Sequence, residues 1–157
     1  MNVLFVEDSL PTQKLIAGTT ATAFPMVKLT CCETLEQAKQ LVSMADVIVL
    51  DLGLPGSTHE DVFDWISECG KPVVIYTAST TQDVAIEAVR AGAMNVVCKG
   101  SPAEQLVIGL YVAIAEHQLL EDERSRRREI AERLHDVLSK WCRVFADTLS
   151  CGNAPQK

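Results

Sequence analysis

The sequence predicts an α/β protein with a doubly wound, five-stranded parallel sheet and a long C-terminal helical extension. Short runs of β-branched residues alternate five times with helix-like stretches, which is typical of parallel strands joined by crossover helices. Three of these runs are apolar throughout, as expected for a sheet that helices cover on both faces. The expected strands span residues 2–6, 27–32, 47–50, 73–77 and 95–98.

Helix start and stop signals lie between these strands. Ser9 stands before Pro11 at the start of one helix-like stretch, and Thr58 is followed three residues later by Asp61, which is a capping-box pattern. A glycine stands just beyond the third and fourth stretches. The expected helices therefore span about 10–22, 34–44, 58–69 and 80–91.

The fifth helix is expected to be much longer than the others. It begins near Ser101 and Pro102, and the next proline is Pro155, so one helix over about 102–150 is predicted. Such a helix measures ~70 Å at a rise of 1.5 Å per residue, whereas a globule of ~100 residues is about half as wide. We therefore expect a first domain over residues 1–117, a helical extension over 118–150 and a flexible tail over 151–157.

Composition excludes several classes of protein. Hydrophobic residues make up 48% and charged residues 22% of the chain, the balance of a folded globular protein, and the formal charge of −7 suits nucleic acid poorly. The arginines of the tail alternate with acidic residues at helical spacings, which indicates a solvated helix face.

Six cysteines without a CxxC pair predict free, buried thiols in a reducing cytoplasm. The longest apolar run is far shorter than the ~20 residues of a membrane span.

Polar side chains end four of the five predicted strands. In open parallel sheets, ligands bind outside the carboxyl ends of the strands, and here these ends carry Glu7, Asp8, Asp51, Thr77 and Lys99. Taken singly, each is an ordinary polar strand end. Together, three carboxylates at close range require either a hard divalent cation or a protonated member. Mg²⁺ is the natural candidate, with Asp8 and Asp51 as direct ligands and Glu7 bound through water. Asp51 is then a candidate nucleophile, and Thr77 and Lys99 face an incoming phosphoryl group.

The motifs around these residues, "VEDS", "VIVLDLGLPG", "VVIYTAS" and "AGAMNVVCKGSPAEQL", resemble the receiver domain of two-component response regulators over residues 1 to about 117. The resemblance implies a flavodoxin-like fold and phosphoryl transfer to Asp51 from a phosphohistidine on a sensor histidine kinase or a phosphotransfer protein. It also implies that Mg²⁺ is held by Asp8, Asp51 and the carbonyl of Gly53, and that Thr77 and Lys99 read the phosphorylated state.

Two positions depart from the family's pattern. Many members carry an aromatic switch residue three positions before the lysine, where this chain has Val96. An aromatic flip is therefore not expected. The switch residues that the resemblance implies in this chain are Thr77 and Val96. A proline often follows the lysine, but here Gly100 follows, so a cis peptide bond is not expected.

The tail carries an apolar stripe that predicts partner helices. Its residues recur at spacings of 4, 3, 4 and 3, and three further apolar residues widen the stripe, so we expect a homodimer through the C-terminal helix. The stripe consists of Ile130, Leu134, Val137, Trp141 and Val144, with Leu138, Phe145 and Leu149 beside it.

The segment "ERSRRREIAERLHDVLSK" also resembles the phosphoacceptor box of one histidine kinase subfamily. The resemblance implies a phosphorylatable His135 with Asp136 as its polarising neighbour, and it departs at Lys140, where the family usually has glutamine. The alternative is that His135 is a surface residue beside a dimer seam. No ATP-binding domain is recognisable, so self-sufficient kinase activity is not expected.

Three functional hypotheses follow from these motifs. The leading one is a response regulator receiver with a dimerising output helix. The second is a phosphotransfer protein or truncated hybrid histidine kinase fragment in which His135 is also phosphorylated. The third is an interaction protein that keeps the fold without phosphorylation, and the complete set of acidic pocket residues argues against it.

Overall fold

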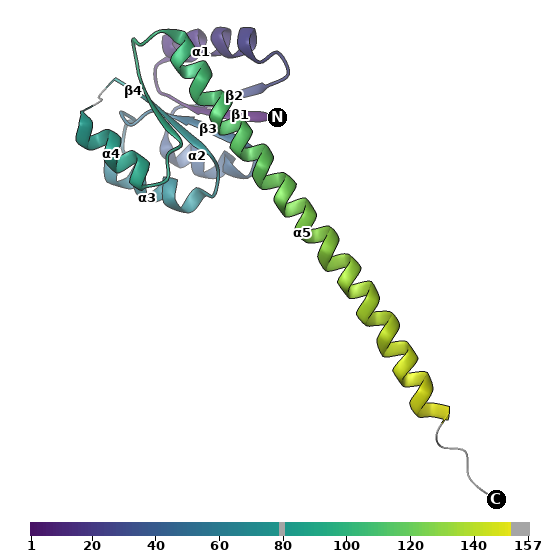
Figure 1. The fold of residues 1–157 in the computed structure, drawn as a ribbon. Coiled ribbons are helices and arrows are strands. Elements are labelled where there is room, and N and C mark those ends of the chain that lie inside the picture. Colours follow the sequence, from purple (N-terminus) through teal and green to yellow (C-terminus); the bar gives the residue numbers. More distant parts are fainter. Residues whose placement is uncertain (79–80, 152–157) are drawn as a thin grey trace, which may run out of the picture. The chain divides into compact units, whose positions relative to one another are not determined.

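The structure is a computed structural model that describes residues 1–78 and 81–151, with side chains described as far as residue 140. The chain forms two compact units, Met1–Gln118 and a second unit from Leu119 onward. The first unit holds a five-stranded parallel sheet in the order β2-β1-β3-β4-β5, which confirms the predicted doubly wound α/β fold (Figure 1). The strands are β1 (Asn2–Val6), β2 (Lys28–Cys32), β3 (Val47–Leu50), β4 (Val73–Thr77) and β5 (Asn95–Cys98).

Six helical segments connect or follow the strands. The second predicted helix ends earlier than expected, because a 3₁₀ turn in which the Ala45 amide bonds to the Val42 carbonyl at 3.2 Å takes over its last turn before the chain extends into β3. The fourth begins at Gln82, where the Thr81 hydroxyl accepts a bond from the Val84 amide. The helices are α1 (Leu10–Ala23), α2 (Leu35–Leu41), η1 (Val42–Met44), α3 (His59–Cys69), α4 (Gln82–Arg90) and α5 (Ala103–Cys151).

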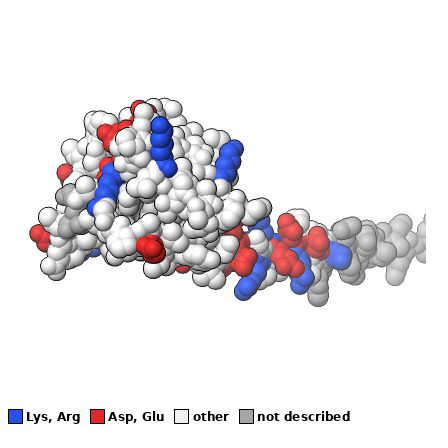
Figure 2. All heavy atoms as spheres, turned by 90° about the horizontal axis from the view of Figure 1, so that it is seen from above, with Lys and Arg blue, Asp and Glu red and all other residues white. Residues whose placement is uncertain are grey.

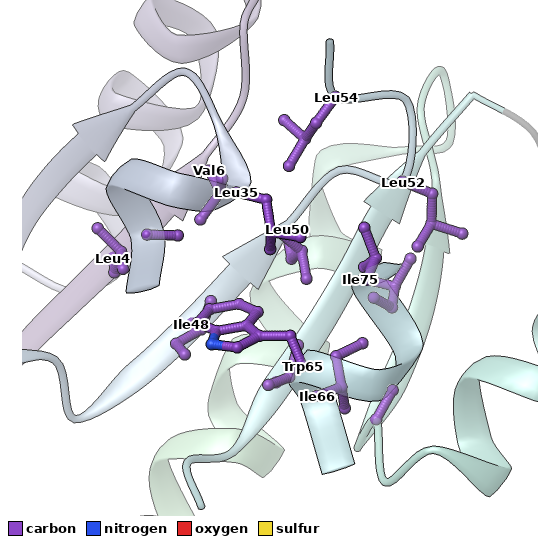
Figure 3. Packing of buried hydrophobic residues seen from close by; sticks show 14 of the residues in the cluster. Leu4, Val6, Leu35, Ile48, Leu50, Leu52, Leu54, Trp65, Ile66 and Ile75 are labelled. Carbon is purple, nitrogen blue, oxygen red and sulfur yellow. The ribbon is translucent and has the colours of Figure 1, made fainter. Parts of the chain in front are cut away.

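Side chains of the sheet alternate between two hydrophobic cores. Along β1, Leu4 and Val6 enter one core, and Val3 and Phe5 enter the other, as the period of two along a strand requires. The first core lies against α2, α3 and α4, with Trp65 of α3 packed near Ile48 and Ile66 (Figure 3). The second lies against α1 and α5. Both faces of the sheet are thus covered, and its carboxyl edge is left to bear polar side chains.

The predicted caps are present where the first and third helices begin. The Ser9 hydroxyl accepts a bond from the Thr12 amide, which starts α1 immediately after the carboxyl end of β1. At α3, Thr58 and Asp61 form a complete capping box, in which the Thr58 amide donates to the Asp61 carboxylate at 2.8 Å. These caps fix the points at which the chain turns away from the sheet edge.

Gly109 allows α5 to approach the sheet closely. A Cβ atom at this position would lie 3.2 Å from Asn95 Nδ2, 3.3 Å from Val74 Cγ1 and 3.5 Å from Val97 Cγ2. Leu106, Leu110 and neighbouring Ala113 of the same helix are buried in the second core. A residue without a side chain is therefore needed where the helix crosses β4 and β5.

The second unit is the continuation of α5 from Leu119. Its charged side chains form ion pairs within the helix, Arg124–Glu121 at 2.8 Å and Arg127–Glu123 and Arg133–Glu129 at 2.6 Å each, so the arginine run is a solvated helix face as expected. Figure 2 shows basic and acidic side chains close together along the coloured part of the helix. Trp141, Val144, Phe145, Leu149 and the predicted tail at 151–157 lie outside the described side chains.

Two further expectations concern the cysteines and the membrane. All four cysteines with described side chains are free; Cys32 is buried, and Cys69 and Cys98 are only partly buried. The expectation of buried thiols was wrong for Cys31, which is exposed. It lies on β2, an edge strand, where alternate side chains face away from the core. In the part of the chain that the structure describes, no helix has the length and apolar character needed to cross a bilayer.

We predict that Gly109→Leu lowers the free energy of unfolding by about 1–3 kcal/mol, because the new side chain overpacks the contact between α5 and the sheet. The matched control is Ala17→Leu on α1, an exposed position outside the groove between α1 and α5, where the change should stay within about 0.5 kcal/mol. Urea unfolding followed by circular dichroism measures both. Equal effects of the two substitutions would contradict the close approach at Gly109.

Candidate functional site

Backbone pairing continues beyond three strands and holds the candidate residues at one edge of the sheet. The Glu7 amide donates to the Cys32 carbonyl at 2.9 Å, the Asp51 amide to the Val6 carbonyl at 3.0 Å, and the Lys99 amide to the Thr77 carbonyl at 2.7 Å. The side chains of Glu7, Asp51 and Lys99 are therefore fixed at their bases by the sheet. Thr77 is buried and pairs in register with Cys98, the residue before Lys99.

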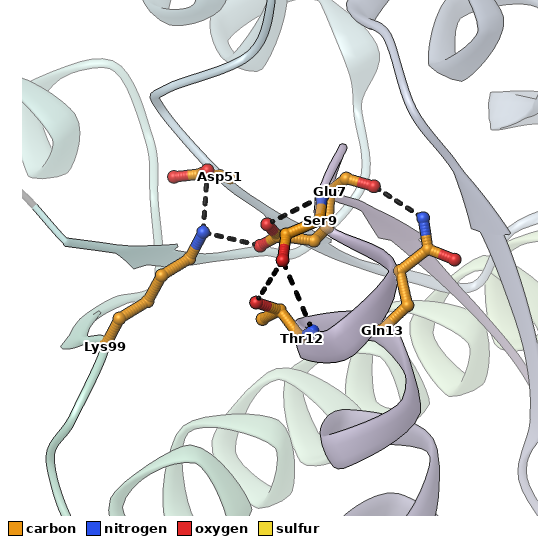
Figure 4. Close-up of polar contacts among 6 residues, drawn as sticks. All are labelled: Glu7, Ser9, Thr12, Gln13, Asp51 and Lys99. Atoms are coloured by element: carbon orange, nitrogen blue, oxygen red, sulfur yellow. Dashed lines mark hydrogen bonds and ion pairs between the residues drawn. The ribbon is translucent and has the colours of Figure 1, made fainter.

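Lys99 bridges two buried carboxylates at the centre of this site. Its Nζ lies 2.6 Å from Oε2 of Glu7 and 2.7 Å from Oδ2 of Asp51 (Figure 4). Glu7 is fully buried, and the Asp51 side chain is only 7% exposed. Two buried like charges repel strongly unless a cation lies between them, and the ammonium of Lys99 provides that cation. The Lys99 Nζ also lies 5.9 Å from the centre of the Tyr76 ring, within the range of a cation–π contact.

Burial and the ion pairs shift the pKa values of this cluster. Burial raises the pKa of the Glu7 carboxyl, and the hydrogen bond and charge of Lys99 offset this only in part. Burial alone would lower the pKa of Lys99, but its bonds to Asp51 and Glu7 outweigh that effect, so the pKa of Lys99 is raised. Lys99 therefore stays protonated at neutral pH. The protonated form of the Glu7 carboxyl is favoured more than it would be for a glutamate in solution.

Three carboxylates at this edge could hold a divalent cation. Ligand oxygens of Glu7, Asp8 and Asp51 lie within 4.8 Å of one another, and Asp8 is exposed to solvent beside the two buried carboxylates. Carboxylate oxygens are the ligands that Mg²⁺ prefers. At Gly53, a Cβ would lie 3.3 Å from Asp51 Oδ2, so glycine keeps the approach to the Asp51 carboxylate free of a side chain. The chemistry of the donor set therefore fits Mg²⁺.

Ser9 and Gln13 support the site, a role that was not predicted from the sequence. The Ser9 amide donates to Glu7 Oε1 at 3.2 Å, and Gln13 Nε2 donates to the Glu7 carbonyl at 2.6 Å (Figure 4). Both residues belong to the start of α1, so the cap of this helix also orients Glu7. The available signal was that Ser9 caps a helix only two residues after Glu7.

The remaining candidate residues have other surroundings. Val96 is partly buried and packs against the first core, so an aliphatic side chain occupies the position on β5 where a switch residue was predicted. Gly100 has φ of +92°, a left-handed conformation that proline does not adopt, and no cis peptide bond occurs in the described residues. His135 lies on an exposed stretch of α5 in the second unit, whereas Asp51 belongs to the first.

We predict that Glu7→Gln becomes progressively more stable than the unsubstituted protein as the pH rises above about 4.5, when both are measured in EDTA. A group whose pKa is raised on folding stabilises the fold below its unfolded pKa, and that contribution is lost as the pH rises through the folded pKa. Glutamine does not ionise, so the Glu7→Gln variant does not lose stability in this way. Chemical unfolding at several pH values measures the difference. The matched control is Glu68→Gln, the same change at an exposed position on α3, and a parallel trend there would contradict the assignment to Glu7.

Comparison with known proteins agrees with this geometry. The model of the response regulator receiver domain family matches residues 3–110. The signal receiver domain of a putative Luxo repressor protein from Vibrio parahaemolyticus is 30% identical, with 76% of this chain and 94% of that chain covered and a TM-score of 0.69. A comparison with curated protein sequences finds no match.

Two more distant structures share the fold. The BeF3-activated N-terminal receiver domain of Klebsiella pneumoniae RstA is 21% identical over 73% of this chain and 98% of that chain, with a TM-score of 0.65. The Mn(2+)-bound form of response regulator Rcp1 is 22% identical over 68% and 86%, with a TM-score of 0.58. Because the family model spans more than half of the chain and agrees with the fold and the acidic edge, this chain belongs to the response regulator receiver domain family.

Proposed function

We propose that this receiver accepts a phosphoryl group on Asp51 from a phosphohistidine of a sensor histidine kinase or a phosphotransfer protein. The observation that carries the proposal is the contact of the Lys99 ammonium with both Asp51 and Glu7. It keeps a positive charge 2.7 Å from the nucleophilic carboxylate, where the oxygens of an incoming phosphoryl group gather.

In the transfer step, one Asp51 carboxylate oxygen attacks the phosphorus atom in line with the donor nitrogen. The new P–O bond forms as the P–N bond breaks, and the imidazole nitrogen keeps the electron pair and later takes up a proton from solvent. A carboxylate nucleophile has no proton to lose, so the step needs no general base. Gly53 leaves the approach to this carboxylate free of a side chain.

A magnesium ion would be held by Asp8, Asp51 and the carbonyl of Gly53, with Glu7 bound through water. When bound, it neutralises charge on the phosphoryl oxygens as they approach the carboxylates. The close grouping of the three carboxylates supports this assignment. The Mn(2+)-bound form of Rcp1 supports it by analogy.

Phosphorylation would redistribute the contacts of Lys99. Before transfer, its ammonium is shared between Glu7 and Asp51. Phosphorylation adds negative charge at Asp51, which attracts Lys99 and the Thr77 hydroxyl toward the new oxygens. Lys99 begins the turn between β5 and α5, so a shift in its position is passed to α5. The switch position on β5 is aliphatic Val96, so the proposed output does not depend on an aromatic flip.

We also propose that residues 1–117 form the receiver, that 118–150 form a homodimerisation helix, and that the protein is cytoplasmic. The four stripe residues with described side chains are exposed, Ile130 at 66%, Leu134 at 58%, Val137 at 50% and Leu138 at 55%. Between residues 119 and 140, most of the other residues are charged. Such a stripe favours packing against a partner helix.

We predict that a small phosphodonor such as acetyl phosphate with Mg²⁺ phosphorylates the protein once, and that Asp51→Asn abolishes the product. Intact-mass spectrometry measures the phosphorylated fraction. Asp46→Asn, the same change at a carboxylate on the amino side of β3, is the matched control and should leave the product unchanged. Chelating the metal should slow the reaction by at least tenfold, because a hard cation stabilises the transferred phosphoryl group.

His135→Ala separates this proposal from the phosphotransfer alternative. It should leave the phosphorylated fraction unchanged. If the product persisted in Asp51→Asn and disappeared in His135→Ala, the histidine would be the acceptor and the proposal would fail. The absence of any product in the unsubstituted protein would instead favour a pure interaction protein.

We predict that Leu134→Glu raises the dimer dissociation constant at least 100-fold, because each dimer loses two buried leucines and gains two charges in an apolar seam. Analytical ultracentrifugation of the full chain measures the constant. Ser125→Glu, which adds the same charge to the opposite side of the helix, is the matched control. A monomeric protein at all accessible concentrations would contradict dimerisation.

A further inference from the structure

We propose that the groove between α1 and α5 of the receiver docks a second copy of this chain, with the α1 wall of one copy against the α5 wall of the other. The proposal rests on the proposed dimerisation and deepens it, because it names the receiver surface that takes part. It is independent of the phosphorylation of Asp51, whose carboxylate does not line the groove.

The groove has a volume of about 790 Å³ and a mainly apolar lining. The α1 wall includes Leu15 and Gly18, and the α5 wall includes Val107 and Ile108. Gly18 has no neighbouring atom within 4 Å of a built Cβ, so the α1 wall has room there for a side chain from outside. All lining residues belong to the first compact unit.

Large apolar side chains around the groove are exposed. Leu15 is 62% exposed, Ile108 59% and Tyr111 63%. The Tyr111 ring lies 5.1 Å from the ring of Phe24, which follows α1, so its position is fixed although it faces solvent. Seen from the side on which α1 lies, most of the receiver surface is uncharged (Figure 2). Clustered apolar exposure of this kind marks interaction surfaces.

Two opposite charges identify the occupant as a second copy. Lys14 lies on the α1 wall and Glu104 on the α5 wall, both exposed. Among the ion pairs of the described residues, neither charge takes part in one. In a two-fold symmetric interface, residue i of one copy meets residue j of the other and the reverse. When the α1 wall meets the α5 wall, Lys14 therefore meets Glu104 twice, and the apolar residues of both walls are covered together.

The test uses two single charge reversals, Lys14→Glu and Glu104→Lys, in the full chain. Each variant alone places like charges opposite each other at both contacts, so its homodimer dissociation constant should rise about tenfold. A mixture of the two variants restores both attractive contacts. The mixed heterodimer should therefore form with a dissociation constant within about threefold of the unsubstituted homodimer. Native mass spectrometry with one variant labelled with ¹⁵N distinguishes the heterodimer from both homodimers.

The matched controls are Lys28→Glu on β2 and Glu87→Lys on α4, the same reversals at exposed positions outside the groove. They should change the constant less than threefold and show no preference for the mixed dimer. If the two groove variants also showed no preference for each other, the proposed pairing would be wrong.

Apolar substitutions separate this proposal from dimerisation by the tail alone. Ile108→Glu in the groove should weaken the dimer at least tenfold, and circular dichroism should report an unchanged fold, because Ile108 is exposed. A dimer that survives Ile108→Glu but dissociates with Leu134→Glu would overturn the groove proposal and leave the tail proposal standing. A monomeric unsubstituted protein would overturn both, and phosphorylation of Asp51, measured on the same samples, is unaffected by either result.

Discussion

The ammonium of Lys99, held between two buried carboxylates, is the interaction on which the functional site depends. Glu7 follows β1 and Asp51 follows β3, two strands that lie side by side in the sheet. Lys99 follows β5, which β4 separates from β3. A long side chain is needed to cross that distance, and its charge offsets the cost of burying two carboxylates. Lysine meets both requirements, so the ion pairs explain the residue type as well as its position.

The same interaction makes the site responsive to added negative charge. The Lys99 ammonium is shared between two carboxylates, so a phosphoryl group on Asp51 competes with Glu7 for its charge. Burial raises the pKa of the Glu7 carboxyl, which lowers the cost of releasing Lys99, because Glu7 can take up a proton in its place. Under the proposed phosphotransfer, Glu7 is thus the partner that gives way, and the bonds from Ser9 and Gln13 keep it in position while it does.

The strands and the site could be predicted because both follow from local patterns. Four strands begin and end where the apolar runs do, whereas β2 starts one residue late because the Val27 amide is used in a turn with Phe24. The carboxyl ends of parallel strands must share one edge, so the acidic cluster followed once the strands were known. The roles of Ser9 and Gln13 and the groove between α1 and α5 depend on tertiary neighbours that no sequence period encodes.

Energetics decides whether the tail stripe can hold two copies together without the receiver. Full burial of a large aliphatic side chain stabilises by about 1.5–3 kcal/mol. The four stripe side chains that the structure describes are already a third to a half buried, so each gains about half of that in a dimer. Their burial in both copies contributes about 6–12 kcal/mol in total, whereas association costs about 4–15 kcal/mol in lost translational and rotational freedom. The described stripe is therefore marginal alone. Leu15, Ile108 and Tyr111 add comparable exposed apolar surface on the receiver, so pairing through the groove would change a marginal association into a stable one.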